Sequence, residues 1–168
     1  PVIYTLGPAD IQEVTRVGNS AFFLMGYSAA FWLELLSHRS SVVAFGCRDG
    51  GTDSLVGFLV VSKDARVVIP AEERVGPLHA LLRHRKCAYV RTMAVLRSYR
   101  RLGVASMLLE AASAALRAMR NPPTLLLCRV PAHNGEAVAC LERNGFTVYT
   151  EMPGLVCGAD RLFTHMIY

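Results

Sequence analysis

The stretch Tyr89-Val-Arg-Thr-Met-Ala-Val-Leu96, followed by Arg97-Ser-Tyr-Arg100 and Arg101-Leu-Gly-Val-Ala-Ser106, decides how this chain folds. The residues from Cys87 to Leu96 predict a strand, and the amphipathic pattern from Leu102 to about Met119 predicts a long helix. Only a short basic turn separates the two elements. The sequence therefore predicts a strand that leads directly into the first turn of a helix.

The start of that helix has the properties of an anion-binding site. A helix start leaves backbone N–H groups unpaired and carries the positive end of the helix dipole, so phosphate binds there readily. Arg100 and Arg101 add positive charge, Gly103 and Ala105 remove side-chain bulk, and Ser106 offers a hydroxyl group. We therefore expect a diphosphate at this turn; the alternative is a helix whose first turn is merely basic.

Two common phosphate motifs do not describe this turn. A loop of the NTP-binding type needs a Gly-Lys-Ser/Thr run after an upstream glycine, and a dinucleotide fingerprint needs a third glycine. The turn therefore predicts a phosphate ligand of another class.

The rest of the chain predicts one mixed α/β domain, residues 1–168, around a single sheet. Residues 63–86 form a long polar connection with a short helix around Pro77 to His84. Ser28 and Asn134 are expected helix caps. The other expected elements, in chain order, are an early strand near Val2 to Leu6, helices from Pro8 to about Met25 and from Ser28 to Ser37, strands at Ser41–Cys47 and Ser54–Val61, the strand and helix quoted above, a strand at Thr124–Val130, a helix at Asn134–Asn144, and strands at Phe146–Thr150 and Leu162–Tyr168.

Composition sets limits on the class of protein. The chain has 168 residues, of which 52% are hydrophobic and 18% charged, so it can bury a core and is not a disordered chain. The longest clean apolar run, Leu55 to Val61, is too short to cross a membrane. Five cysteines are scattered singly without a C-x-x-C pair, so we expect no zinc site, no disulfide framework and a reducing, cytoplasmic setting.

Positive charge is concentrated in one segment. The formal net charge is +5, and residues 74–109 contain eight Lys or Arg residues and no Asp or Glu. Such a block favours an anionic partner, although Arg83 to Lys86 can equally form a solvated basic face. Nucleic acid is disfavoured as that partner, because only Tyr89 and Tyr99 supply interleaved aromatic rings.

Three segments resemble one known family. Arg100-Arg-Leu-Gly-Val-Ala105 resembles the R/Q-x-x-G-x-G/A signature of the GNAT superfamily of N-acetyltransferases, and Met93-Ala-Val-Leu96 resembles its bulged strand. Asn134-Gly-Glu-Ala137, followed by Glu142-Arg-Asn-Gly-Phe146, is similar to a later segment of the same family. The three matches occur in the order and spacing of that family.

The resemblance implies a fold, a cosubstrate and a binding site. The fold would be a mostly antiparallel seven-stranded sheet flanked by about four helices, and the cosubstrate would be acetyl-CoA, with no metal ion. The implied cofactor-binding residues are Met93, Ala94, Val95, Arg100, Arg101, Leu102, Gly103, Val104, Ala105, Ser106 and Asn134.

Within the superfamily, the chain resembles N-terminal protein acetyltransferases, especially the catalytic subunit of the NatE type. Tyr99-Arg-Arg-Leu-Gly103 is similar to the cofactor loop of that group, and Phe23-Leu-Met-Gly-Tyr27 is similar to its substrate loop, with Leu24 in place of a proline. The implied substrate-binding residues are Phe23, Tyr27, Arg91 and Arg129.

The chain also departs from that group. Arg129 stands where the group has a histidine, Leu141 where many family members have a tyrosine, and Leu155 and Val156 where a tyrosine pair is expected. These departures bear on the acceptor and leave the cofactor segment untouched.

The resemblance implies direct attack of a neutral amine on the thioester, with backbone N–H groups of Met93 to Val95 polarising the carbonyl. Tyr89 is the preferred catalytic residue, acting by orienting a water that takes the proton, and His133 is a second candidate. Each has a simpler alternative: Tyr89 packs in a strand and His133 is an exposed loop residue. Cys128, without a positioned base, is expected to pack in the core.

The resemblance implies an acetyltransferase that modifies the α-amine of a protein N-terminus. Two alternatives stay open: acetylation of a small amine such as a polyamine, an amino sugar or an antibiotic, and a CoA-binding or scaffold module without catalysis. A ribosome or an auxiliary subunit is a candidate partner, and no membrane partner is expected.

Overall fold

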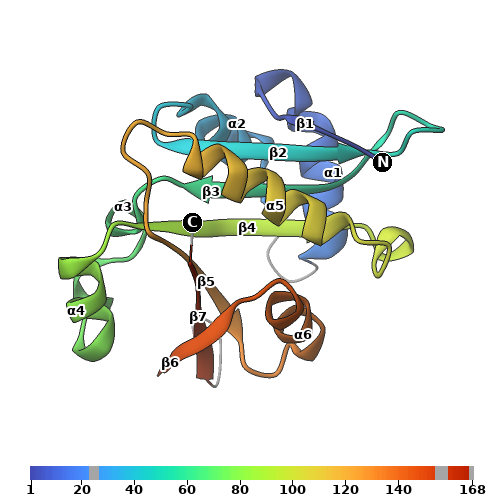
Figure 1. Cartoon of the computed structure of the whole chain (residues 1–168). Helices are drawn as coiled ribbons and strands as arrows, with labels where there is room; N and C mark the ends of the chain where they lie inside the picture. Colours follow the sequence, from blue (N-terminus) through green and yellow to red (C-terminus); the bar gives the residue numbers. More distant parts are fainter. Residues whose placement is uncertain (23–26, 154–158, 167–168) are drawn as a thin grey trace. The chain divides into compact units, whose positions relative to one another are not determined.

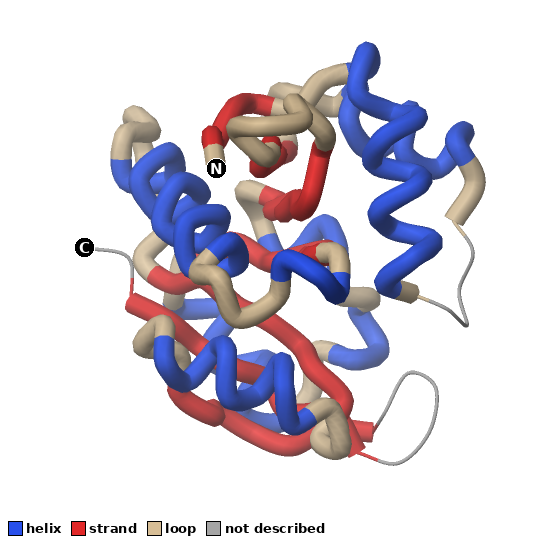
Figure 2. The backbone as a smooth tube through the Cα atoms, turned by 90° about the vertical axis from the view of Figure 1, so that its right-hand side faces the viewer, coloured by secondary structure: helices blue, strands red, loops and turns tan. Residues whose placement is uncertain are grey.

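The computed structural model describes residues 1–22, 27–153 and 159–166, and Figure 2 follows their helices, strands and loops along the backbone. The predicted substrate residue Phe23 and the substituted positions Leu155 and Val156 lie outside the described residues. Contact density divides the chain into two compact units. The first comprises residues 1–61 and 92–115, and the second comprises residues 62–91 and 116–168.

The described strands form one seven-stranded mixed sheet, as the sequence predicts (Figure 1). Its strand order is β1-β2-β3-β4-β5-β7-β6, in which β4 and β5 pair in parallel while β1–β2, β5–β7 and β6–β7 pair antiparallel. The bounds are β1 (Val2–Thr5), β2 (Val42–Arg48), β3 (Leu55–Ser62), β4 (Cys87–Val95), β5 (Leu125–Pro131), β6 (Thr147–Pro153) and β7 (Ala159–Met166).

The described residues contain six α-helices, where about four were expected to flank the sheet. The two additional helices both lie in the 63–86 connection, and one of them is the short helix predicted there. The bounds are α1 (Ile11–Ala21), α2 (Ala29–Ser37), α3 (Ala65–Val68), α4 (Gly76–His84), α5 (Val104–Arg117) and α6 (Gly135–Arg143).

Local chemistry sets the helix ends. Ser28 caps α2, since its hydroxyl accepts a hydrogen bond from the Phe31 N–H at 3.2 Å. The helix predicted from Pro8 begins as a 3-10 turn and ends at Ala21 instead of continuing toward Met25. Helix α5 begins at Val104 rather than Leu102, because the preceding backbone takes left-handed φ angles that no α-helix accommodates.

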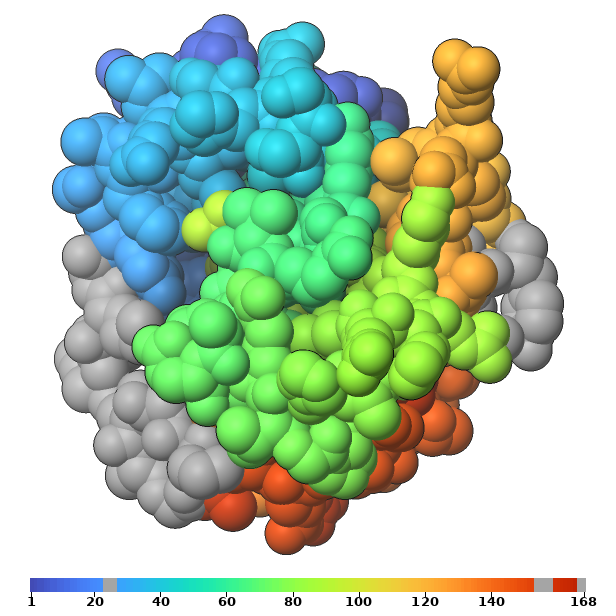
Figure 3. Space-filling model, turned by 90° about the vertical axis from the view of Figure 1, so that its left-hand side faces the viewer, coloured from blue at the N-terminus to red at the C-terminus, as the bar shows by residue number. Residues whose placement is uncertain are grey.

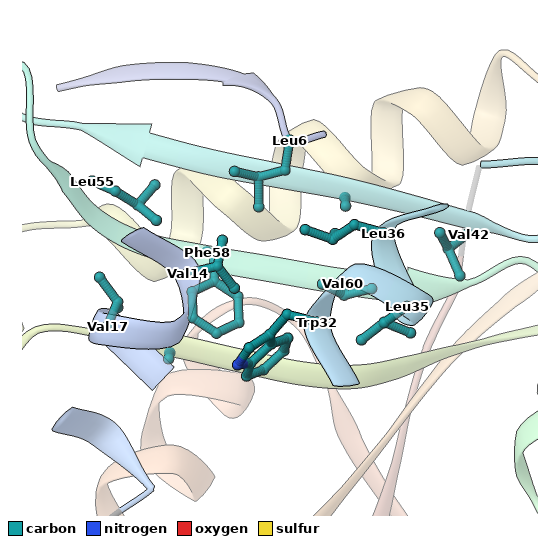
Figure 4. Packing of buried hydrophobic residues seen from close by; sticks show 12 residues of the cluster. Leu6, Val14, Val17, Trp32, Leu35, Leu36, Val42, Leu55, Phe58 and Val60 are labelled. Carbon is teal, nitrogen blue, oxygen red and sulfur yellow. The ribbon is translucent and has the colours of Figure 1, made fainter. Parts of the chain in front are cut away.

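The core of the first unit lies between the sheet and helices α1 and α2. These helices cover one face of β2 and β3, and α5 crosses the opposite face (Figure 1). Trp32 of α2 is fully buried and meets Phe58 of β3 edge to face, with ring centroids 5.2 Å apart (Figure 4). Burial of these two large rings stabilises the packing of α2 against β3.

The core of the second unit lies on β4, β5 and β7. Leu125, Leu127 and Leu162 of the strands pack with residues of α3 and α4, including Leu78 and Leu82. The 63–86 connection is therefore a folded cover with its own buried side chains and is not a loose loop. In the described part of the chain, no helix combines the length and the apolar character needed to span a membrane.

Candidate active site

The turn that leads into α5 is held by hydrogen bonds of Tyr99. Residues Arg97–Tyr99 form a 3-10 turn whose Tyr99 N–H donates to the Leu96 carbonyl at 2.9 Å. The Tyr99 hydroxyl donates to the Asp49 carboxylate at 3.3 Å, and Asp49 lies in the turn between β2 and β3. We call residues 97–106 the α5-entry loop. A loop held in this way is preorganised before any ligand binds.

Two residues of the α5-entry loop have left-handed backbone angles. Arg101 has a φ of +63° and Gly103 a φ of +83°, and both residues are exposed. A positive φ is rare for a non-glycine residue and concentrates at functional sites. A Cβ added to Gly103 would meet nothing within 4 Å, so the space in front of this backbone is open.

Gly57 of β3 explains how the start of α5 reaches the sheet. A Cβ at Gly57 would lie 2.9 Å from the Val104 side chain and 3.1 Å from the Ala94 carbonyl oxygen. Because the first contact would force a shift and the second is tight, glycine at this position lets Val104 and the end of β4 come together without displacement. The predicted cofactor residues Ala94 and Val104 are therefore neighbours in the structure.

The end of β4 is joined to the loop by an arginine. The Arg100 Nε donates to the Val95 carbonyl at 3.3 Å, and the Leu96 N–H donates to the Val56 carbonyl at 2.9 Å. Leu102 is 65% exposed, Ser106 is exposed, and Ala105 and Met93 are half-buried. The loop thus presents cationic and small residues on open backbone, which fits a diphosphate.

Thr92 of β4 adds an observation that the sequence did not flag. Its hydroxyl is buried, and no group among the described residues forms a hydrogen bond with it. A buried hydroxyl without a partner costs free energy, so such a group beside Met93 is a candidate hydrogen-bonding contact for a bound molecule.

A second group of predicted residues gathers on one face of the sheet in the second unit. Tyr89 pairs with Leu127, and Leu127 is followed two positions later by Arg129. Arg129 pairs with Leu162 of β7, and Asp160 lies two positions before Leu162 on the same strand. Because side chains alternate between faces and paired residues share a face, Tyr89, Arg129 and Asp160 lie on the same face.

Arg129 is enclosed by two carboxylates. Its Nε donates to Asp160 at 2.7 Å and its Nη1 donates to Glu73 at 2.6 Å. The exposed fractions of the Arg129 and Asp160 side chains are 8% and 4%, and that of Glu73 is 29%. We call Tyr89, Glu73, Arg129 and Asp160 the Tyr89 cluster. A buried guanidinium requires such pairing, since the desolvation of an unpaired charge is costly.

The environment of Tyr89 keeps its phenol protonated. Burial, and then the nearby Cys128 thiol, raise the pKa of Tyr89 well above its usual range. Arg129 lowers that pKa, while Glu73 and Asp160 raise it. Tyr89 can therefore hold a water or an amine by hydrogen bonds, but it is not itself a base near neutral pH. Burial also raises the pKa of Cys128 to about 12, as expected for a thiol packed in the core.

The remaining predicted residues are placed as follows. Asn134 caps α6, since its Oδ1 accepts from the Ala137 N–H at 3.2 Å, and His133 beside it is exposed. Arg91 is exposed on β4. Tyr27 of the first unit stacks on Phe31 with centroids 4.6 Å apart and meets Trp32 edge to face at 5.2 Å. Tyr27 is thus part of an aromatic group that also covers the core.

Sequence reasoning missed Glu73, Asp160 and Thr92. Glu73 is 56 residues away from Arg129, and Asp160 is 31 residues away from it. No local motif connects these positions, and only the folding of the sheet brings these opposite charges together. Among the described residues, no group of three or more His, Cys, Asp or Glu side chains is arranged to hold a metal ion.

The family of the chain follows from its sequence. The model of the acetyltransferase (GNAT) family matches residues 11–146. The chain belongs to this family and is therefore an acetyl-CoA-dependent N-acetyltransferase. The exposed, cationic α5-entry loop, with its open Gly103, fits the diphosphate of that cosubstrate.

Solved structures share the fold at low sequence identity. The chain is similar to Arabidopsis thaliana NAA60 in complex with acetyl-CoA, with 18% identity, a TM-score of 0.75 and 99% and 98% of the two chains covered. It is also similar to the ribosomal-protein-S18-alanine N-acetyltransferase from Escherichia coli, with 19% identity, a TM-score of 0.70 and 99% and 93% covered.

A third similar structure is yncA from Salmonella typhimurium with its cofactor acetyl-CoA, at 14% identity, a TM-score of 0.75 and 99% and 94% covered. No curated protein matches the chain significantly in sequence. At these identities the similar structures establish the fold alone.

Proposed function

We propose that this protein acetylates the α-amine of protein N-termini. The observation that carries the proposal is the Tyr89 cluster, a partly buried phenol held protonated beside an arginine that is bound by two carboxylates. Such a site can orient an amine and a water but offers only a weak base, so it suits an acceptor that is already partly neutral.

The pKa values of amines support that choice. An α-amine with a pKa of roughly 7.7–8.0 is about one-tenth neutral at pH 7. A lysine side chain with a pKa of about 10.4 is neutral in fewer than about one molecule in a thousand. A site with a weak base therefore acts more readily on N-termini than on lysine side chains.

In the proposed reaction the neutral amine attacks the thioester carbonyl, the amine loses a proton through a water held by Tyr89, and CoA leaves as its thiolate. Backbone N–H groups from Met93 to Val95 polarise the carbonyl, and the α5-entry loop binds the diphosphate. Asn134 caps α6 and is the cofactor contact proposed in the second unit. Phe23, Tyr27 and Arg91 are proposed substrate contacts.

Similar solved structures support the proposal, since one of them is the ribosomal-protein-S18-alanine N-acetyltransferase. A cytoplasmic location, with a ribosome or an auxiliary subunit as partner, is the corresponding proposal for where the enzyme meets its substrates. Cell fractionation followed by ribosome pelleting tests it, and a protein confined to a membrane fraction would contradict it.

The decisive experiment measures CoA release from acetyl-CoA with three sets of acceptors. The sets are peptides with a free α-amine, the same peptides with a blocked α-amine and one free lysine, and small amines including a polyamine, an amino sugar and an aminoglycoside. We expect release with the first set, and mass spectrometry should place the acetyl group on the N-terminus. The Gly103→Glu variant, which alters the proposed diphosphate site, is the matched inactive control.

Other outcomes of this experiment identify the alternatives. Release with small amines alone would replace the proposal with a small-molecule acetyltransferase. Binding of acetyl-CoA without release on any amine would indicate a module that retains the fold without catalysis.

A further inference from the structure

The 63–86 connection supplies one member of the Tyr89 cluster. Its helices α3 and α4 pack on the face of the sheet that carries Tyr89, with Ala65, Ile69, Leu78 and Leu82 in the shared core. In the space-filling view the segment, drawn in green, forms a continuous part of the molecular surface (Figure 3). The 3-10 turn Ala71–Glu73 lies between the two helices and carries Glu73.

Backbone contacts fix the position of Glu73. Its N–H donates to the Pro70 carbonyl at 3.1 Å. The neighbouring Arg74 donates from Nε and Nη2 to the Ile69 carbonyl at 2.9 and 2.7 Å, and from Nη2 also to the Arg66 carbonyl. Because Arg74 ties the turn to α3, Glu73 is held in place and does not depend on the ion pair alone for its position.

The charges of the cluster do not cancel. Arg129 contributes one positive charge, and Glu73 and Asp160 contribute one negative charge each, so the three side chains sum to −1. Without Glu73, Arg129 and Asp160 would sum to zero, and Nη1 of the guanidinium would lose its carboxylate. One residue of the 63–86 connection therefore supplies the carboxylate that occupies Nη1 of Arg129.

We propose that Glu73 is a specificity-determining residue, which with Asp160 keeps Arg129 from binding acidic groups of the acceptor and so excludes acidic N-termini from the site. The inference rests on the proposed function, because it places the acceptor at Tyr89. Glu73 acts through Arg129 and is a positioning residue; it is not assigned a contact with the reacting atoms.

Simple electrostatics supports the direction of this effect. The Glu73 and Asp160 carboxylates repel a carboxylate in the second position of a peptide, whereas they do not repel an uncharged side chain there. Without Glu73, Arg129 would instead attract such a carboxylate, since a guanidinium binds carboxylates with two parallel hydrogen bonds. Glu73 therefore changes attraction of a peptide carboxylate by Arg129 into repulsion.

The test compares two peptides that differ only by Asp or Asn at the second position. The wild-type protein should prefer the Asn peptide in kcat/KM. Glu73→Gln keeps a hydrogen-bond acceptor for Arg129 but removes the charge, and it should shift the Asp-to-Asn ratio of kcat/KM by about tenfold toward the Asp peptide. Glu73→Asp keeps the charge and should retain the wild-type preference.

Glu72→Gln is the matched control. Glu72 is the adjacent residue, is exposed and lies in the same turn, so its replacement removes the same charge without touching Arg129. An identical ratio in Glu72→Gln and Glu73→Gln would overturn the inference. Asp160→Asn should shift the ratio in the same direction as Glu73→Gln, so the result does not depend on the folding of one variant.

The same data separate this inference from the proposed function. If the wild-type protein acetylates no peptide, the proposed function fails, and a pair of small amines that differ by one carboxylate is compared in the same variants. If peptides react but Glu73→Gln leaves their ratio unchanged, the role of Glu73 fails while the proposed function stands.

Discussion

The α5-entry loop and the Tyr89 cluster differ in how far apart their parts lie in the chain. The loop is contiguous, and its charge, small residues and left-handed turns occur within residues 97–106. The cluster joins β4, β5, β7 and the 63–86 connection, with partners up to 56 residues apart. The site proposed for the constant cosubstrate is therefore local, whereas the site proposed for the variable acceptor is assembled from distant segments that can change independently.

The largest effect should come from breaking the Tyr89 cluster. Arg129→Met removes the cation from between Asp160 and Glu73 and should lower the free energy of unfolding by about 3–5 kcal/mol, since a carboxylate that is only 4% exposed loses this ion pair. Urea denaturation measures this change.

The matched control for that variant is Arg161→Met. Arg161 pairs with Glu151 at 3.3 Å, and the two side chains are 36% and 61% exposed, so the loss should stay below about 1 kcal/mol. Equal losses for the two arginines would show that the Arg129 network contributes no more than a surface ion pair.

The α5-entry loop should be most sensitive at Gly103. Gly103→Glu places a negative charge and a Cβ on a backbone with a φ of +83°, and should weaken acetyl-CoA binding by about 100-fold. Titration calorimetry measures the affinity. Gly50→Glu is the control, because Gly50 also faces open space but its φ is not in the left-handed region. Unimpaired affinity in Gly103→Glu would remove the diphosphate from this loop.

Tyr89→Phe should separate the two regions functionally. Removing the hydroxyl should lower kcat about tenfold and leave acetyl-CoA affinity unchanged, since the cosubstrate site is assigned to other residues. Because the pKa of Tyr89 is raised by burial, its phenol stays protonated across the working range.

The pH dependence of Tyr89→Phe tests whether Tyr89 stays protonated during the reaction. The rise of kcat/KM with pH should follow the acceptor amine, near its pKa of roughly 7.7–8.0, in both the wild-type protein and Tyr89→Phe. A rise that disappears only in the variant would make Tyr89 the titrating group and would contradict its role as a phenol that stays protonated.

The smallest effect is expected at Thr92. Thr92→Val removes a buried hydroxyl that has no partner among the described residues, so the free energy of unfolding of the free protein should rise by up to about 1 kcal/mol. If the hydroxyl contacts the cosubstrate, acetyl-CoA affinity should fall by about fivefold. Thr15→Val, which loses a hydrogen bond to the Ile11 carbonyl, should leave that affinity unchanged.

Most elements of the fold could be predicted because their signals are local. The sequence predicted the helix caps at Ser28 and Asn134 and the strand-to-helix junction at residues 87–106. The sheet also has the predicted seven strands. The start of α5 was predicted two residues early, because nothing in the residue type of Arg101 announces its left-handed backbone. The 63–86 connection was read as largely polar, although its buried Leu78 and Leu82 make it a cover for the sheet.

The sequence by itself determined the family, the cosubstrate and the position of the α5-entry loop, since a helix start with basic and small residues carries its chemistry within about ten positions. Only the tertiary structure decided what surrounds Tyr89. Glu73, Arg129 and Asp160 meet because strand register places Arg129 and Asp160 on one face, because the 63–86 connection covers that face, and because a buried arginine requires opposite charges, whatever their separation in the chain.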